Sequence, residues 1–149
     1  MKKTKKRVIM RGQIATGTYS GHENRLQVFD GKYTTGYKVV EFRISPNNPD
    51  SSQEYSAKLS TEPISTISAF NWQNIQEFAW ATWGEPSSAA GDRVIIAEDN
   101  MVVEDLYVSA YTSGEGTVLN YYIVLDQYEF PAWTGAGILV ENLSQAGPQ

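Results

Sequence analysis

The chain has 149 residues, no cysteine and a formal net charge of −5 at pH 7. This length is enough for one domain with a sizeable core, and the lack of cysteine excludes disulfides and thiolate metal sites. No run of about 18 apolar residues and no apolar signal segment near the start is present, so the sequence predicts neither a membrane span nor a secretory signal. We therefore expect the protein to be made in a cytoplasm.

The basic residues are concentrated near the N-terminus. Residues 12–149 carry six basic against seventeen acidic groups, which makes the body of the protein acidic and its tip basic. Such a body repels nucleic acid and anionic membranes, whereas the tip can contact phosphates or an acidic neighbour. The alternative is a solvated terminus without a partner. The basic residues of the tip are Lys2, Lys3, Lys5, Lys6, Arg7 and Arg11.

The chain alternates between β-type runs and turn-rich loops. Strands are expected over residues 8–14, 25–29, 37–44, 54–60, 75–83 and 93–97. In the third of these runs, Val40, Phe42 and Ile44 fall on one face. The run at 75–83 also fits a helix, and its aromatic content and its setting among strands favour a strand. Asp30-Gly31 predicts a tight turn.

The strongest β pattern covers residues 101–130. Two long runs flank a loop that contains Gly114 and Gly116, which is typical of a hairpin with a five-residue connection. Each run alternates an aliphatic face with a mixed, tyrosine-rich face. The aliphatic faces contain Val102, Leu106, Val108 and Ala110 in the first run, and Leu119, Tyr121, Ile123 and Leu125 in the second. A lone ribbon cannot bury such a face, so the rest of the chain must supply an opposing sheet.

These elements predict an all-β protein, a two-sheet β-sandwich of jelly-roll or Greek-key type with about eight strands. Residues 1–11 form a basic arm that leads into the first strand, residues 12–145 form the single domain, and residues 146–149 form a flexible tail. Beyond Pro131 the spacing of Trp133 and Leu143 suits a short helix that begins near Thr134.

No coherent catalytic set is visible. His22 is the only histidine and lies in a glycine-flanked loop, where a solvated residue is the simpler interpretation than a catalytic base. Glu98-Asp99-Asn100 and Glu104-Asp105 could hold a hard cation or act as a glycosidase pair. A turn followed by a charged strand explains the same residues more simply. We therefore expect no enzymatic activity, no metal and no cofactor.

Aromatic residues are numerous, with four tryptophans and nine tyrosines. Exposed rings would suit a sugar-stacking platform or a protein interface, whereas buried rings would only fill the core. The tryptophans are Trp72, Trp80, Trp83 and Trp133. The residues predicted to lie at a subunit interface are Tyr107, Tyr111, Tyr122, Tyr128 and Trp133.

Several short runs together resemble one group of proteins across most of the chain. They are Arg11-Gly12-Gln13, Asp30-Gly31, Gly36-Tyr37-Lys38-Val39 with the strand to Ile44, Val102-Val103-Glu104-Asp105-Leu106-Tyr107, Asn120-Tyr121-Tyr122-Ile123, Ile138-Leu139-Val140-Glu141-Asn142 and Ser144-Gln145. In these runs the chain is similar to small virion proteins of environmental, largely marine, bacteriophages. The shared runs are structural and contain no catalytic motif.

The resemblance implies a β-sandwich subunit that assembles in many copies within a virion, after synthesis in the host cytoplasm. Its expected partners are other copies of itself, other virion proteins and, through the basic arm, packaged nucleic acid. The chain is short for the main shell protein of a tailed phage, whose usual fold is α+β, so a decoration or minor capsid role is equally open. The alternative is a carbohydrate-binding β-sandwich module that uses exposed aromatic rings, and an enzyme ranks third.

Overall fold

The computed structural model describes residues 2–16, 22–28, 31–32, 34–47, 54–63, 69–84, 92–112 and 118–131. Within these residues the protein is all-β. Its strands are β1 (Lys2–Ala15), β2 (His22–Gln27), β3 (Thr35–Pro46), β4 (Tyr55–Ser60), β5 (Glu77–Trp83), β6 (Asp92–Ile96), β7 (Asp105–Thr112) and β8 (Val118–Glu129). The predictions of a strand rather than a helix around residues 75–83 and of about eight strands in all are confirmed for the described part of the chain.

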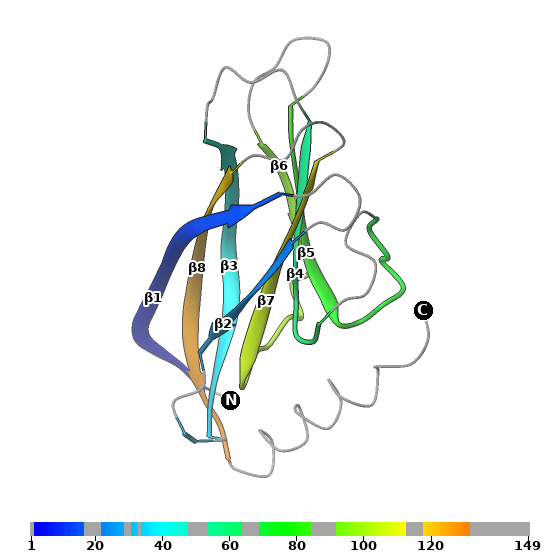
Figure 1. The fold of residues 1–149 in the computed structure, drawn as a ribbon. Coiled ribbons are helices and arrows are strands. Elements are labelled where there is room, and N and C mark those ends of the chain that lie inside the picture. Colours follow the sequence, from blue (N-terminus) through cyan, green and yellow to red (C-terminus); the bar gives the residue numbers. More distant parts are fainter. Residues whose placement is uncertain are drawn as a thin grey trace.

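The strands form two antiparallel sheets that face each other. One sheet has three strands in the order β1-β8-β3, and the other has five in the order β2-β7-β4-β5-β6. Figure 1 shows the two sheets as separate layers of a β-sandwich. The core between them is built from the inward faces of both sheets, and it includes Phe42, Leu59, Leu106, Ile123 and Leu125, all essentially inaccessible to solvent. Each such side chain stabilises the fold by about 1.5–3 kcal/mol relative to exposure.

The two long runs at 101–130 do not form the predicted hairpin. β8 pairs with β1 and β3, whereas β7 pairs with β2 and β4 in the other sheet. The aliphatic faces of the two runs therefore meet across the core instead of lying side by side on one sheet. A hairpin and two strands in facing sheets both require apolar residues at every second position. The alternation specifies which face of a strand is buried and does not specify which strand lies at its hydrogen-bonded edge.

A break in the first of these runs separates Val102 from β7. Val102 exchanges backbone hydrogen bonds with Tyr37, at 2.8 Å in each direction, as an isolated bridge, and β7 begins only at Asp105. The break also explains why Glu104 interrupts the aliphatic pattern of the sequence. The residue opposite this region, Gly36, has no room for a side chain, since a Cβ there would lie 2.8 Å from the ring of Phe130.

One residue of β3 does not face the predicted side. The register between β3 and β8 shifts between Val39 and Glu41, so Val40 is the extra residue of a β-bulge and is 40% exposed. Val39 is buried in its place. The amide of Asn100 satisfies the backbone of Val39 by accepting its N–H (2.8 Å) and donating to its carbonyl oxygen (3.2 Å).

The basic residues near the N-terminus are part of the sandwich. The sequence predicts an arm over residues 1–11, but β1 begins at Lys2 and pairs with β8 from Lys2 opposite Glu129 to Ala15 opposite Val118. Over this stretch Asp126 on β8 binds basic side chains of β1, as described below. The first strand is therefore longer than the apolar run at 8–14 that predicted it.

Three predictions fall on residues that the structure does not describe. These are the loop with Gly114 and Gly116, the short helix from Thr134 with Trp133 before it, and the tail at 146–149. The helix therefore remains a prediction from the sequence.

Candidate functional site

A trough crosses the outer face of the three-stranded sheet. It has a volume of about 510 Å³ and is lined by three consecutive residues from each strand, namely Arg11, Gly12 and Gln13 of β1, Asn120, Tyr121 and Tyr122 of β8, and Arg43, Ile44 and Ser45 of β3. The register places these residues in three rows across the sheet. We refer to this feature as the trough.

The middle row forms the floor of the trough. Gly12, Tyr121 and Ile44 are direct cross-strand neighbours, and the side chains of Tyr121 and Ile44 are buried. A Cβ at Gly12 would lie 2.7 Å from the hydroxyl oxygen of Tyr121, so a side chain there would displace this ring. Burial raises the pKa of Tyr121, which keeps its hydroxyl protonated. The floor is therefore backbone, and the adjacent rows form the walls.

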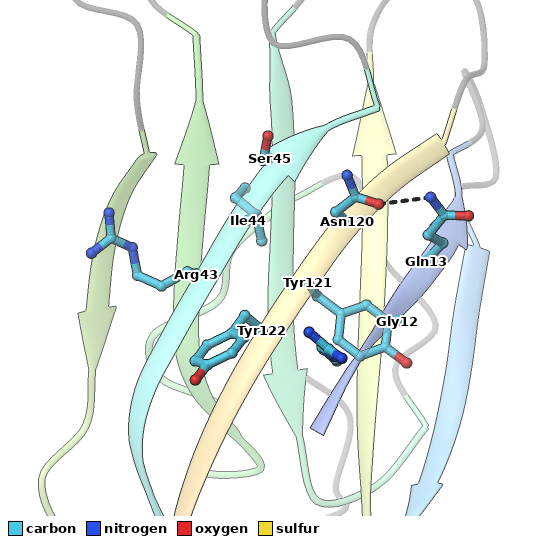
Figure 2. A pocket seen from close by; sticks show the side chains of 9 residues that line it. Gly12, Gln13, Arg43, Ile44, Ser45, Asn120, Tyr121 and Tyr122 are labelled. Carbon is cyan, nitrogen blue, oxygen red and sulfur yellow. Dashed lines mark hydrogen bonds between the residues drawn. The ribbon is translucent and has the colours of Figure 1, made fainter. Parts of the chain in front are cut away.

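One wall combines cationic and aromatic side chains. Arg11, Tyr122 and Arg43 are cross-strand neighbours in β1, β8 and β3. Tyr122 is 36% exposed, and Figure 2 shows its ring reaching from β8 toward β3. Both arginines are exposed at the two ends of this row. The wall thus presents an aromatic ring on β8 with an arginine on each neighbouring strand.

The opposite wall is polar and uncharged. It consists of Gln13, Asn120 and Ser45, again direct neighbours across the three strands. The Nε2 of Gln13 donates to the Oδ1 of Asn120 at 2.9 Å, as the dashed line in Figure 2 shows. This bond uses one donor of Gln13 and one acceptor of Asn120. The Oε1 of Gln13 and the Nδ2 of Asn120 are not engaged by it and provide an acceptor and a donor at the rim.

The two arginines differ in their charge balance. Arg43 forms a bidentate pair with Asp92, with Nη2 at 2.7 Å from Oδ1 and Nε at 2.8 Å from Oδ2, and the same carboxylate accepts the N–H of Ile44 at 3.0 Å. These contacts raise the pKa of Arg43 and hold its guanidinium toward β6, at the edge of the trough (Figure 2). Arg11 forms no ion pair with any residue that the structure describes. Among the described residues, Arg11 is therefore the arginine of the trough without an ion-pair partner.

Positive charge continues along the same sheet. Strands β1, β3 and β8 contain eight of the chain's twelve basic residues but only three of its seventeen acidic residues. Asp126 of β8 is held by Arg7 (Nε to Oδ1, 2.8 Å) and by Lys3 (Nζ to Oδ2, 3.1 Å). The bond from Arg7 lowers the pKa of Asp126 against the opposing effect of burial. The three-stranded sheet is thus the basic pole of an otherwise acidic protein.

The tyrosines predicted to share an interface lie on opposite sides of the sandwich. Tyr107 and Tyr111 are half-buried on the outer side of β7 in the five-stranded sheet. Tyr122 and Tyr128 are on the outer side of β8 in the three-stranded sheet, and Trp133 lies outside the described residues. The prediction of one tyrosine-rich face assumed that β7 and β8 pair, and it is wrong because they belong to different sheets.

The five-stranded sheet buries an ion pair on its outer side. Lys58 of β4 and Glu77 of β5 have side chains that are 1% and 2% exposed, with Nζ and Oε2 3.1 Å apart. The Nζ of Lys58 also donates to the carbonyl oxygen of Ala69 at 2.7 Å. The Oε1 of Glu77 accepts the N–H of Asn71 and the Nε1 of Trp80, both at 3.0 Å. Ala69 and Asn71, which precede β5, are thereby held over the sheet.

Apolar side chains are exposed next to this ion pair. The ring of Trp72 is 65% exposed and packs against Trp80 with ring centroids 5.5 Å apart. Ile95 of β6, the cross-strand neighbour of Trp80, is 53% exposed. We call Trp72 and Ile95, with the largely buried Trp80 between them, the Trp72 patch.

The acidic residues that could have formed a metal or catalytic site are separated. Asn100 is buried and hydrogen-bonds to the backbone of Val39. Glu98 and Asp99 are exposed in the turn before Asn100. The Oδ2 of Asp105 is 2.7 Å from the Nη2 of Arg25. In the described parts of the chain no group of three or more His, Cys, Asp or Glu side chains is placed to hold a metal ion. His22 lies in β2, whereas the sequence predicts a loop there.

The sequence did not predict the trough, although its signal is present. Arg11-Gly12-Gln13 and Asn120-Tyr121-Tyr122 each put polar or aromatic residues on either side of an inward position. Only the register, which sets Gly12 opposite Tyr121 and Tyr121 opposite Ile44, shows that these triplets lie side by side.

Comparisons with known proteins find similarity at the level of structure. No protein-family model matches the chain, and no curated protein matches it. A chain of Desmodium yellow mottle tymovirus is similar over 85% of this chain and 88% of its own length, with 10% sequence identity and a TM-score of 0.37. Among the residues described, no helix is long and apolar enough to cross a membrane.

Proposed function

We propose that the protein is a non-enzymatic structural subunit of a virion with a jelly-roll fold. The observation that carries the proposal is the strand order, β1-β8-β3 in one sheet and β2-β7-β4-β5-β6 in the other. A jelly roll made of two Greek keys has strands 1, 8, 3 and 6 in one sheet and 2, 7, 4 and 5 in the other. β6 pairs here with β5, yet Asp92 at its start joins it to Arg43 and Ile44 of β3.

The jelly-roll fold is compatible with more than one function. It occurs in viral capsid proteins and in lectins, and a fold alone does not assign an activity. The resemblance of several sequence runs to small virion proteins of environmental bacteriophages favours the first class. A carbohydrate-binding module would need several exposed rings in a row, and of the tryptophans that the structure describes, Trp72 is exposed, Trp83 is partly buried and Trp80 is buried.

Self-association is the activity that this role requires. The Trp72 patch supports it. Single exposed apolar residues are ordinary, but an exposed tryptophan in contact with another and flanked by an exposed isoleucine is a surface suited to protein contact. We infer that this patch contacts other copies of the chain or other virion proteins. We further infer that the basic residues of β1 contact packaged nucleic acid by electrostatic attraction. The proposed location is the virion.

Light scattering after gel filtration, over a range of protein and salt concentrations, tests self-association. We expect discrete oligomers whose population grows with protein concentration. Ile95→Lys should lower the mass, because it places a charge in the Trp72 patch. Gln27→Lys is the matched control, since Gln27 is exposed on β2, at the opposite edge of the same sheet.

Two results would contradict this proposal. If the wild-type protein is a monomer under every condition, the proposal of self-association is wrong. An unchanged oligomer for Ile95→Lys would remove the Trp72 patch from the contact and leave the interface elsewhere.

A further inference from the structure

We propose that the trough binds single-stranded nucleic acid and takes one base between its two walls. This inference rests on the proposed contact between β1 and nucleic acid and deepens it, because it replaces a general attraction by a defined site. It depends on the geometry of β1, β8 and β3, and the Trp72 patch on the other sheet is not involved.

The spacing of the walls suits a flat ring. Residues two positions apart on a strand point to the same face and are about 6.8 Å apart, twice the rise of about 3.4 Å per residue. Tyr122 and Asn120 are such a pair on β8, as are Arg11 and Gln13 on β1. A planar ring stacks on another at about half this separation, so one base fits between the rows while it stacks on Tyr122.

The polar wall can cover the second face of that base. The Gln13–Asn120 hydrogen bond fixes the two amides relative to each other at 2.9 Å. It leaves the Oε1 of Gln13 and the Nδ2 of Asn120 as an acceptor and a donor at the rim, where the sugar and the next base of a single strand would lie. Sulfated or carboxylated polysaccharides offer anionic groups but no flat ring to fill the gap between the walls.

The cationic ends of the other wall can hold the phosphates on either side of that base. Arg11 is exposed and forms no ion pair among the described residues, so a phosphate would supply its counter-charge. Arg43 is already oriented by Asp92 and is exposed over 60% of its side chain. Lys3 and Arg7 extend the basic track along β1. A duplex keeps its bases stacked inside, so it can use the track but not the trough.

The test is fluorescence anisotropy with labelled oligothymidylate of about 15 nucleotides, titrated with the full chain at several salt concentrations. The variants are Tyr122→Leu, Tyr122→Phe and Arg11→Gln. Arg93→Gln is the matched charge control, because Arg93 is an exposed arginine on β6 in the other sheet. Because Tyr122, Arg11 and Arg93 are exposed, all variants should keep the wild-type urea midpoint.

The expected results separate stacking from charge. Tyr122→Leu should weaken binding about 5- to 100-fold at every salt concentration, whereas Tyr122→Phe keeps the ring and should bind as wild type does. Arg11→Gln should reduce the slope of log affinity against log salt by about 0.7, the value for one phosphate contact on a single strand. Arg93→Gln should change neither quantity, and a duplex of the same length should bind more weakly than the single strand.

Each contrary result has a defined meaning. If Tyr122→Leu binds as wild type does, or if the duplex binds as tightly as the single strand, the trough takes no base and the inference is wrong, while contact between β1 and phosphates stands. If dextran sulfate competes as well as unlabelled oligothymidylate, the face is a general polyanion surface. If the wild type binds no oligonucleotide, both the trough and the proposed nucleic-acid contact fail, and self-association is judged separately by light scattering.

Discussion

Replacing Glu77 by Gln removes one charge from the buried pair with Lys58 while preserving its shape. The amide oxygen can still accept from Asn71 and Trp80, as the Oε1 does at 3.0 Å in each bond. What is lost is the counter-charge 3.1 Å from an ammonium that is 1% exposed. The Lys58 Nζ keeps its bond to the carbonyl oxygen of Ala69 at 2.7 Å, which compensates only part of the cost of a buried charge.

The expected loss follows from the burial of both partners. Removing one member of a buried ion pair costs about 3–5 kcal/mol, because the other charge stays desolvated without compensation. We expect E77Q and K58M each to lower the free energy of unfolding by about this amount. The double variant K58M/E77Q removes both charges and keeps the hydrogen bonds that Asn71 and Trp80 donate to residue 77. It should therefore lose less free energy of unfolding than either single variant. Domain stabilities of about 5–15 kcal/mol leave the single variants folded.

The assay is equilibrium unfolding in urea followed by tryptophan fluorescence. The control is the exposed pair of Arg25 and Asp105, where R25Q should cost no more than about 1 kcal/mol because water screens the charges. If K58M/E77Q loses the sum of the two single losses, the charges are not coupled and the reasoning is wrong. Losses below about 1 kcal/mol for both single variants would show that the pair is hydrated.

Two further predictions concern a hydrogen bond and an ion pair that hold strands together. Asn100→Ala should cost about 2–3 kcal/mol in urea unfolding, because it leaves the buried backbone of Val39 without its partner, whereas Asp99→Ala next to it should stay within about 0.5 kcal/mol. Because the bond from Arg7 lowers the folded-state pKa of Asp126, ionised Asp126 stabilises the fold above its unfolded pKa of about 3.9, and this contribution is lost as the pH falls through the folded value. Asp126→Asn should therefore reduce the fall in the free energy of unfolding at acidic pH. A fall as steep as in the wild type would show that Asp126 does not cause it.

The alternation of apolar and polar residues along the sequence was sufficient to predict most strands and their buried faces. Phe42 and Ile44 of β3, and Ile123 and Leu125 of β8, lie in the core as the pattern indicated. Val40 does not, because it is the extra residue of the bulge in β3 and its side chain is turned outward. A bulge depends on the partner strand, so the pattern of one strand cannot reveal it.

Burial of charge could not be predicted from the sequence. Alternation places Lys58 on the outer face of β4, where a lysine is normally solvated. Ala69 lies over that face, and it and Glu77 supply the partners that make burial possible. These contacts join residues up to 19 positions apart, and nothing in the run around Lys58 specifies them.

The sequence by itself determined an all-β sandwich, its inward faces and a basic N-terminus, because these follow from residue type and from the two-residue period of a strand. Only the tertiary structure decided that β7 and β8 lie in different sheets, that Lys2–Ala15 is a paired strand, and that Gly12, Tyr121 and Ile44 form one row under the trough. Those features depend on backbone hydrogen bonds between segments far apart in the chain, and the side-chain pattern of a strand does not encode which edge it pairs with.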